Sequence, residues 1–526
     1  MRRIGRFALV VFEIALLTAL IVAPRCANYQ EVFVAGNVYF VDADCYGRMT
    51  RAQMVSIKPG LIIRHHAFEN FPQGLTPHTT APLDYLIVAL SFLASPFTAR
   101  ALDLAGAFVS PLLALLGGWF LWWWSRRMKF RYRWVMLILY TISPILVHGT
   151  ELGRPDHQSL LILLVAIAIC AGWSSQTVQR VNMASAWWPT SVAAWALAIW
   201  VSAYEPLVLF LMLTAMTLVM DGRAVFGRDR RAGWILFAVI IAIAFAVERR
   251  VPSLAILQRN AHFKEWASTI GELAHVSPIN PVWFNWCGYL LLITPILIWM
   301  SFRTRNGAHG VPALPYVLLV PTYLLTVWQA RWGYFFLLIF ALALPALLDP
   351  IKSGVAVWLA FVLSTFPMLR DWDEQLWPND GQLAKRMEKQ VQSVEIHDLA
   401  ISLRSPDVHP FLAPWWLSPS IAYWSGQPGV AGSSHESLEG INESARFFVS
   451  ENLQEERQIL GKRHVAWIFA YDSDRVAQHS VAILKEPLPQ QPLCRVLYRT
   501  PSQAPLFLIF LAQTPTCKLY RVNVER

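Results

Sequence analysis

The chain begins MRRIGRFALVVFEIALLTALIVAP (1–24), a basic cluster followed directly by an apolar run. The apolar part holds about 18 residues, which is enough for one α-helix to cross the hydrocarbon core of a bilayer. A cleaved signal peptide has the same order of charge and apolarity, but its apolar core is usually shorter. We therefore predict an uncleaved first span at 7–24, with a cleaved signal peptide as the alternative.

The rest of the chain also has the composition of a membrane protein. Of its 526 residues, 55% are hydrophobic and 15% are charged, whereas soluble domains carry about 25% charged residues. The net charge of +10 does not indicate nucleic-acid binding, because the basic residues form short clusters between apolar runs, as topology signals do. The sequence predicts a polytopic α-helical membrane protein with no nucleic-acid partner.

Apolar runs of spanning length recur along the chain. The stretch 25–80 is largely non-spanning, and the run 81–97 is short and holds Asp84, so we interpret 81–97 as a helix on the outer membrane surface. With the first span, the runs give about eleven crossings. The other predicted spans lie near 101–124, 134–149, 158–173, 187–204, 206–220, 234–247, 282–301, 311–329, 332–349 and 354–369.

Basic clusters set the orientation, because positively charged loops stay in the cytoplasm. An odd number of crossings places all the clusters inside and the tail from about 370 outside, whereas counting 81–97 as a span would place the most basic cluster outside. We therefore predict a transmembrane domain, 1–369, with a large first external loop, 25–100, and an extracytoplasmic mixed α/β domain, 370–526. The clusters are Arg2/Arg3/Arg6, Arg126/Arg127/Lys129/Arg131/Arg133, Arg223/Arg228/Arg230/Arg231 and Arg303/Arg305.

Three of the predicted outer loops carry acidic residues. An isolated loop acid is most often a solvated surface group. Carboxylates from separate loops can instead converge on Mg²⁺ or Mn²⁺, which prefers oxygen ligands and leaves positions for phosphate oxygens. Such an ion would offset the charge of a phosphate leaving group. The acids are Asp42 and Asp44 in VDADCYGRMTRAQ (41–53), Glu151 and Asp156 in ELGRPDHQ (151–158), and Glu272 in STIGEL (268–273).

In order and spacing, these segments resemble the motifs of the oligosaccharyltransferase catalytic subunit and its single-subunit bacterial and archaeal relatives, which are type C glycosyltransferases. DADCYGRM resembles the first acidic motif, with Asp44 in the best-matching position and Asp42 beside it as a substrate-binding residue that supports or substitutes for Asp44. ELGRPDHQ resembles the second motif, and STIGEL resembles a Thr-Ile-x-Glu motif in a long external loop. QARWGYFF (329–336) resembles the segment with a membrane-embedded arginine, and FENFPQG…PLDYLI (68–87) resembles the end of the first external loop.

The resemblance implies a metal-dependent transfer of a glycan from a polyprenyl-phosphate or polyprenyl-pyrophosphate carrier to an acceptor. It implies that Asp44, Asp156 and Glu272 are catalytic and bind Mg²⁺ or Mn²⁺, with His157 as a further ligand. In the family, the first Asp and the loop Glu also hold the acceptor amide. Because an amide nitrogen is a poor nucleophile, positioning and charge stabilisation must supply most of the acceleration.

Two arginines are candidate substrate ligands. Arg331 lies between apolar runs, where an arginine is costly unless it is paired or faces a cavity, so a functional role is favoured over snorkelling. Arg154 lies in an outer loop, as do Lys264, Arg249 and Arg250. These four side chains can bind pyrophosphate or contact lipid headgroups.

The C-terminal domain departs from the family pattern in APWWLSPSIAYWSGQPGVA (413–431). Trp415 and Trp416 match the first two residues of a Trp-Trp-Asp motif that binds the hydroxyl of the acceptor Ser or Thr, but Leu417 replaces the Asp. Without this carboxylate, a charge-assisted hydrogen bond to the acceptor hydroxyl is lost. The Ser418 hydroxyl could replace the carboxylate only in part. The acceptor therefore stays open between an Asn-containing peptide, another peptide pattern, a lipid and a glycan.

The sequence predicts a glycosyltransferase of a bacterial or archaeal cytoplasmic membrane, with its active site and C-terminal domain outside. Its partners would be a lipid-linked glycan donor, a protein, lipid or glycan acceptor, and membrane lipid. A type C glycosyltransferase acting on lipid or polysaccharide is the alternative. A transporter is disfavoured because the acids lie in outer loops rather than on broken helices at mid-membrane. A non-catalytic protein is disfavoured because the acidic motifs are intact.

Overall fold

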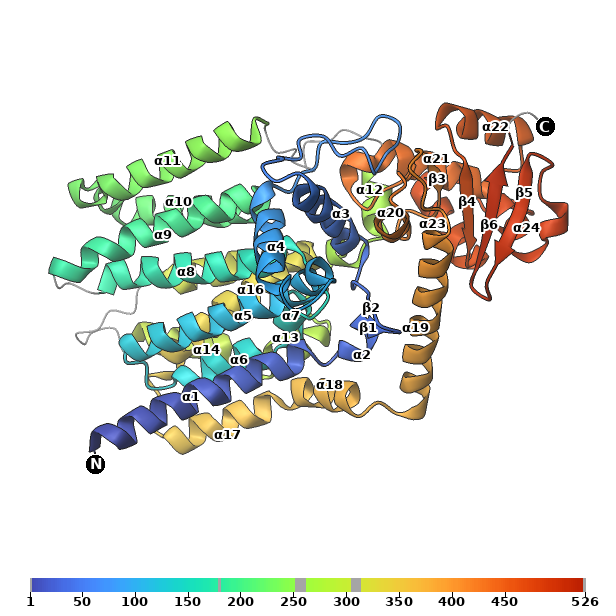
Figure 1. Cartoon of the computed structure of the whole chain (residues 1–526). Helices are drawn as coiled ribbons and strands as arrows, with labels where there is room; N and C mark the ends of the chain where they lie inside the picture. The colour runs from blue at the N-terminus through green and yellow to red at the C-terminus, as the bar shows by residue number, and fades with distance from the viewer. Residues whose placement is uncertain (1, 178–180, 251–261, 304–313, 524–526) are drawn as a thin grey trace. The chain divides into compact units, whose positions relative to one another are not determined.

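The computed structural model of the chain describes residues 2–177, 181–250, 262–303 and 314–523 (Figure 1). These residues form two compact units, each built from three segments of the chain. The first comprises Met1–Tyr29, Phe108–Val247 and Glu272–Asp380; the second comprises Gln30–Ala107, Glu248–Gly271 and Gly381–Arg526. The predicted domain boundary near 370 stays a prediction.

Helices α5 and α11 and the 3₁₀ turn η3 cross a boundary between the units, and most of each lies in the first unit. Each predicted span overlaps one helix or two consecutive helices. The start of the predicted span 311–329, at 311–313, and Arg305 of the last basic cluster lie outside the described residues. The helices are α1 (Arg2–Arg25), α5 (Ala101–Arg127), α6 (Arg133–Ile142), α7 (Pro144–His148), α8 (His157–Thr177), α9 (Val181–Val201), α10 (Tyr204–Phe226), α11 (Arg231–Glu248), α13 (Val282–Cys287), α14 (Leu290–Arg303), α15 (Leu314–Trp328), α16 (Gly333–Leu348), α17 (Gly354–Ser364) and α18 (Phe366–Leu376), with 3₁₀ turns η1 (Arg228–Arg230), η3 (Gly271–Leu273) and η5 (Ala330–Trp332).

Within the described residues, five helical segments are long and apolar enough to cross a membrane, or six if the bent pair α17 and α18 forms one span. Shorter apolar helices accompany them, including α4 (Ala81–Ala94), which confirms a helix in the 81–97 run but not its place in the membrane. The prediction of a polytopic membrane protein is confirmed, while the number of about eleven crossings stays a prediction. The five segments are Gly5–Arg25, Ala101–Arg127, His157–Gln176, Arg231–Glu248 and Ala330–Leu348.

Two predicted spans are broken in the structure. The run 134–149 divides into α6 and α7 at Pro144, which begins α7 because a proline at the first helical position loses no hydrogen bond. The run 282–301 divides into α13 and α14 at Gly288, whose φ of 71° is a left-handed conformation that favours glycine. A Cβ at this glycine would also lie 2.5 Å from the Ser364 carbonyl oxygen.

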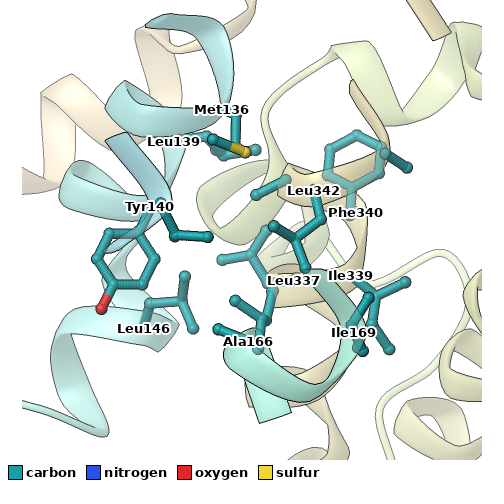
Figure 2. Packing of buried hydrophobic residues seen from close by; sticks show 14 of the residues in the cluster. Met136, Leu139, Tyr140, Leu146, Ala166, Ile169, Leu337, Ile339, Phe340 and Leu342 are labelled. Atoms are coloured by element: carbon teal, nitrogen blue, oxygen red, sulfur yellow. The ribbon is translucent and has the colours of Figure 1, made fainter. Parts of the chain in front are cut away.

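Helix α16 forms the centre of the first unit. All of its residues are buried, as expected of a helix that is apolar on every face, and it packs against α6, α8, α14 and α15. Figure 2 shows this core, in which Leu337 and Phe340 of α16 lie among side chains such as Tyr140, Leu146 and Ala166. The residues at the start of α16 are therefore rigidly placed.

The second unit combines helices with a four-stranded sheet in the order β3-β4-β6-β5. The β3 and β4 strands are parallel and the other pairs antiparallel, which confirms mixed α/β structure after residue 370. The elements are α2 (Tyr29–Val32), α3 (Ala43–Ile57), α4, α12 (Phe263–Ser268), α19 (Asp380–Ile401), α20 (Ser418–Ser425), η6 (His435–Ser437), α21 (Leu438–Val449), α22 (Leu453–Lys462), α23 (Ser473–Leu484), α24 (Leu493–Arg499) and η7 (Pro501–Gln503), with β1 (Phe33–Val34), β2 (Asn37–Val38), β3 (Phe411–Leu412), β4 (Trp467–Tyr471), β5 (Leu508–Gln513) and β6 (Cys517–Val522).

A buried arginine joins the two ends of this unit. Arg463 is fully buried; it donates 2.9 Å to the Phe71 carbonyl oxygen and forms an ion pair with Glu443. The Asn70 side chain accepts a hydrogen bond from the Gly440 amide at 3.0 Å. The FENFPQG segment is thus held by the start of α21 and the end of α22.

Candidate functional site

Helix α3 carries the first acidic motif in the second unit. Asp42 is its N-cap and accepts a hydrogen bond from the Cys45 amide at 3.0 Å, which satisfies an amide that the helix leaves unpaired. Asp44 lies in the first turn. Asp42 therefore has a structural task, and the prediction that it binds substrate stays a prediction.

Two arginines of α3 hold an acid of α4. Arg48 donates to Asp84 at 2.7 Å and is 2% exposed, and Arg51 Nε lies 3.7 Å from Asp84 Oδ2. Arg51 also donates to Thr79 Oγ1 at 3.0 Å. A buried carboxylate between two arginines needs such partners to offset its desolvation. Asp84, the acid inside the 81–97 run, therefore anchors α3 to α4.

Asp156 directly precedes α8 in the first unit. Its Oδ1 accepts a hydrogen bond from the His157 amide at 2.7 Å and lies 2.6 Å from His157 Nδ1. If His157 donates through Nδ1, its lone pair is on Nε2, the nitrogen through which a histidine oriented by a carboxylate can bind a metal. The pair thus has the arrangement expected of two adjacent ligands.

Glu272 ends a directed chain of hydrogen bonds. Arginine has no acceptor, so Arg154 Nη2 must donate to His148 Nε2, 3.0 Å away. The proton of His148 is then on Nδ1, which lies 2.8 Å from the Tyr334 hydroxyl oxygen. Tyr334 in turn donates to Glu272 Oε1 at 3.1 Å. The chain Arg154, His148, Tyr334 and Glu272 therefore orients the predicted catalytic glutamate.

Arg331, in the η5 turn directly before α16, forms an ion pair with Glu205 in the first turn of α10. Glu205 is 2% exposed, and a charge so deeply buried requires a partner. The Arg331 guanidinium also interacts electrostatically with Glu272 and Asp156, as the Tyr334 hydroxyl does with both acids and with Arg154. The first unit thus brings Asp156, Glu272, Arg154 and Arg331 together.

A second group of polar side chains lies in the second unit. His78 Nδ1 is 3.2 Å from Glu436 Oε2, and His435 Nε2 is 3.3 Å from Glu436 Oε1. Desolvation opposes protonation of His78, but the Glu436 and Asp44 carboxylates outweigh it and raise the pKa of His78. Against the same burial, the two imidazoles hold the pKa of Glu436 well below its ordinary value. The group has the ligand types of a divalent-metal site.

The tryptophan motif precedes α20, which packs against α3. The rings of Trp415 and Trp416 are perpendicular with centroids 5.8 Å apart, and the Arg475 guanidinium lies 4.9 Å from the Trp416 centroid. Both indole N–H groups are buried without a hydrogen-bond partner in the described part of the chain. Buried donors of this kind are uncommon, so these two rings could receive an acceptor group from a ligand.

The neighbour of Leu417 has its own backbone contacts. Ser418 is 1% exposed, and its hydroxyl donates toward the Ala413 and Pro414 carbonyl oxygens, each at 3.4 Å. A hydroxyl that donates to backbone still has acceptor lone pairs, so the suggestion that Ser418 partly substitutes for the carboxylate stays a prediction.

Arg250, a candidate for pyrophosphate or headgroup contact, forms an ion pair with Glu248 at 3.3 Å and donates 2.7 Å to the Thr79 carbonyl oxygen. It therefore anchors a loop, and its contact with pyrophosphate or headgroups stays a prediction.

Cys494 and Cys517 in the second unit are free thiols. Burial raises the pKa of each to about 12.

Some of these residues escaped sequence analysis for identifiable reasons. His148 and Glu205 belong to no motif, and Tyr334 lies in QARWGYFF at a position to which the resemblance gave no role. Glu205 lies between apolar runs, where an acid is as costly as Arg331. His78 and Glu436 are 358 residues apart. Only the fold could bring them together.

No protein-family model and no curated protein matches the sequence. Solved structures do match. The Archaeoglobus fulgidus oligosaccharyltransferase tethered with an acceptor peptide containing the NVT sequon has a TM-score of 0.68 at 13% identity, over 87% of this chain and 68% of that chain. The same enzyme in complex with Zn and sulfate has a TM-score of 0.67 at 13% identity, over 97% and 73%.

ArnT from Cupriavidus metallidurans bound to undecaprenyl phosphate has a TM-score of 0.57 at 13% identity, over 98% of both chains. At such identities the likeness concerns the fold and not the chemistry. The resemblance drawn from the motifs is confirmed at this level. The chain has the fold shared by oligosaccharyltransferase and ArnT, that of the type C glycosyltransferases.

Proposed function

We propose that the chain is a membrane glycosyltransferase that moves a sugar or glycan from a polyprenyl-phosphate or polyprenyl-pyrophosphate carrier to an acceptor on the extracytoplasmic face. The observation that carries the proposal is the group formed by Asp156, Glu272, Arg154 and Arg331 in the first unit. These residues come from separate segments, and each matches a motif of the family that the fold resembles. Carboxylates beside arginines suit a metal together with a phosphate.

The residues fit the divalent ion that the family resemblance implies. Asp156 and Glu272 supply oxygen ligands, His157 is oriented by Asp156, and the resemblance assigns Asp44 the same role. When bound, Mg²⁺ or Mn²⁺ would offset the negative charge that develops on the phosphate leaving group. The presence of both acids in the electrostatic environment of Arg331 supports this assignment.

The arginines would act on the carrier. As the bond between the sugar and the phosphate oxygen breaks, the electron pair stays on that oxygen, and fixed cations lower the cost of the resulting charge. Arg331 is anchored by Glu205, and Arg154 donates to Glu151 at 3.0 Å. Both guanidiniums are therefore oriented before the carrier binds, which avoids reorganisation during the reaction.

Glu272 would orient the acceptor. Tyr334 holds one of its carboxylate oxygens at 3.1 Å, and an ionised carboxylate has several acceptor positions in all. A second hydrogen bond, from the acceptor, would direct the nucleophile at the sugar carbon. This step depends on position rather than on acid strength.

The acceptor class has two candidates. Trp415 and Trp416 keep the aromatic part of the peptide-binding motif, but Leu417 offers no oxygen and Ser418 is turned toward backbone. A site without the carboxylate cannot select a Ser or Thr hydroxyl by a charge-assisted hydrogen bond. This favours a lipid or polysaccharide acceptor as the second candidate.

The donor reaction is tested with the full chain purified in detergent and a polyprenyl-phosphate lipid extract from the source cells. Asp44→Asn, Asp156→Asn and Glu272→Gln are each expected to slow metal-dependent consumption of lipid-linked glycan, measured by mass spectrometry. Unchanged consumption in all three variants would contradict the proposal.

The acceptor is tested by mass spectrometry of surface proteins and glycolipids from cells with and without the gene. A change in glycolipid or polysaccharide would support the second candidate. A change confined to Asn-x-Ser/Thr glycopeptides would show that Leu417 does not abolish use of the sequon.

The orientation is also part of the proposal. We place the C-terminal domain and the active site outside a bacterial or archaeal cytoplasmic membrane. An alkaline phosphatase reporter fused after the last residue is expected to be active in cells. If this alkaline phosphatase fusion is inactive, while a reporter that works in the cytoplasm is active at the same position, the orientation is contradicted.

A further inference from the structure

The geometry points to a divalent-metal site formed by His78, His435 and Glu436 in the second unit, suited to a borderline ion such as Zn²⁺. None of these three residues is among the proposed Mg²⁺ or Mn²⁺ ligands, and the site does not rest on the proposed reaction. It would join the first external loop to the start of α21.

The candidate ligand atoms of His78, His435 and Glu436 lie close together. One ligand atom from each residue can be chosen so that all lie within 4.8 Å of one another. Two atoms at about 2.0–2.1 Å from a tetrahedral ion are about 3.3 Å apart. His78 Nδ1 and His435 Nε2 lie 3.2 and 3.3 Å from the two Glu436 oxygens. These two separations, each to a different carboxylate oxygen, are those of neighbouring ligands of one tetrahedral ion, and the remaining ligand separations stay within 4.8 Å.

The ligand types determine which metal the site prefers. Two imidazoles and one carboxylate form the donor set of many zinc sites, whereas Mg²⁺ and Ca²⁺ prefer oxygen ligands alone. The two imidazole rings have centroids 5.0 Å apart and an interplanar angle of 37°. Two histidines can thus approach one ion from neighbouring directions.

The ligands are held from outside the cluster. Arg250 donates to the Pro77 and Thr79 carbonyl oxygens, on either side of His78, and Arg51 donates to Thr79 Oγ1 at 3.0 Å. His435 and Glu436 belong to η6, which runs directly into α21. Ligands fixed by surrounding contacts lose little freedom when a metal binds.

The local charge also favours a cation. Glu436 is mostly buried, with 7% of its side chain exposed, and the Asp44 carboxylate acts on His78. The Arg51 guanidinium opposes these charges. A divalent ion would be attracted by the Glu436 and Asp44 carboxylates.

The alternative is a metal-free ion pair in which both histidines donate to Glu436. That arrangement explains the short contacts, so the two cases must be separated by measuring the metal itself. A metal would tie segments 358 residues apart, and binding free energy gained only in the folded chain appears as stability.

The experiment is a Zn²⁺ titration of the tag-free full chain in detergent, with bound metal measured by mass spectrometry after dialysis. We expect about one tightly bound Zn²⁺ per chain. We expect His435→Ala with Glu436→Gln, and separately His78→Ala, to abolish this binding. The matched control, His409→Ala with Glu486→Gln in the same unit, is expected to bind Zn²⁺ as the wild type does.

Co²⁺ substitution gives a second measurement that needs no activity. Tetrahedral Co²⁺ with imidazole ligands has intense visible absorption bands, which we expect in the wild type and not in His78→Ala. Zn²⁺ retention in all site variants, or no tight binding by the wild type, would overturn the proposal. Size-exclusion chromatography shows whether each variant is folded, and the variants on two separate segments guard against loss through misfolding.

The result can be separated from the proposed reaction with Asp156→Asn. This variant is expected to lose transfer and keep the Zn²⁺. If Asp156→Asn loses the Zn²⁺ as well, the ion belongs to the first-unit carboxylates and the histidine site is wrong. If transfer fails in the wild type while Zn²⁺ binds as expected, the proposed function fails and the site stands.

Discussion

The acids Asp156 and Glu272 of the first unit are stabilised by other cations than Glu436, the acid of the second unit that lies between His78 and His435. Asp156 and Glu272 interact with Arg331, whose charge is permanent, whereas Glu436 faces two imidazoles that can lose their protons. Permanent cations hold carboxylates ready for a metal and a phosphate together. Imidazoles can instead become ligands themselves. The two arrangements therefore suit different metals, a hard ion in the first and a borderline ion in the second.

The largest expected effect is in the first unit. Asp156→Asn keeps the size of the side chain and its hydrogen bond to the His157 amide, but it removes the charge that a metal needs. We expect glycan transfer to fall by about 10²–10³-fold, the usual loss when charge stabilisation is removed. Donor consumption measures the effect, and Asp349→Asn at the end of α16 is the control that should stay near wild type. A loss below fivefold would remove Asp156 from the catalytic group.

Variants of the ion pair between Arg331 and Glu205 test whether the Arg331 charge stabilises the fold. Arg331→Met leaves the buried Glu205 without its partner, which costs about 3–5 kcal/mol. Arg331→Met with Glu205→Gln removes both charges and should recover most of the loss in thermal stability without recovering transfer. If the double variant is no more stable than the single variant, the pair is not the anchor of this end of α16.

The candidate site residues of the first unit were largely predictable from the sequence. In the second unit, Asp44 and the two tryptophans were predictable, but the cluster of His78, His435 and Glu436 was not. Asp156, Glu272 and Arg331 could be predicted because each lies in a short motif whose order is readable along the chain. His148 and Tyr334 could not, because their role depends on hydrogen bonds that only the packing of α7 against α16 provides.

Helix breaks show the same limit. Pro144 and Gly288 were visible in the sequence, but apolar periodicity alone does not reveal whether a span bends or ends at such residues. The sheet order and the meeting of His78 with His435 depend on contacts between distant segments. No local pattern encodes them.

Tyr334→Phe gives a smaller effect within the same unit. It removes the hydroxyl between His148 and Glu272 while the ring stays in place. Losing a hydrogen bond to a charged group costs about 1.5 kcal/mol, so we expect transfer to fall about tenfold with little change in stability. Tyr323→Phe is the matched control, since this ring packs 4.9 Å from Trp283 in the same unit. Equal activity in both variants would show that Tyr334 does not orient Glu272.

The smallest effect concerns a buried acid without a cation. Glu456 in α22 is 2% exposed, and its Oε2 has no hydrogen-bond partner among the residues that the structure describes. Burial, with the nearby Glu455, raises the pKa of Glu456 to about 7. Unlike Glu436, it has no neighbouring imidazole, among the described residues, to hold its charge.

The raised pKa gives Glu456 a pH-dependent contribution to stability. An acid whose pKa is higher in the folded chain stabilises the fold below its unfolded pKa, and this stability is lost as the pH rises through about 7. Glu456→Gln should therefore stabilise the chain at pH ~8 by about 1–2 kcal/mol and have little effect at pH ~5. Thermal unfolding at the two pH values measures the difference. If Glu456→Gln stabilises the chain equally at the two pH values, the pKa of Glu456 is not raised.

The most direct test of the proposed transferase is consumption of lipid-linked glycan before and after metal removal. Full-length protein in detergent is treated with a chelator, dialysed, and given Mg²⁺ or Mn²⁺ with a polyprenyl-phosphate lipid extract. We predict that consumption falls to background after chelation and returns with the added ion in the wild type, but not in Asp156→Asn. Consumption that survives chelation, or an Asp156→Asn variant that recovers with the wild type, would contradict the account.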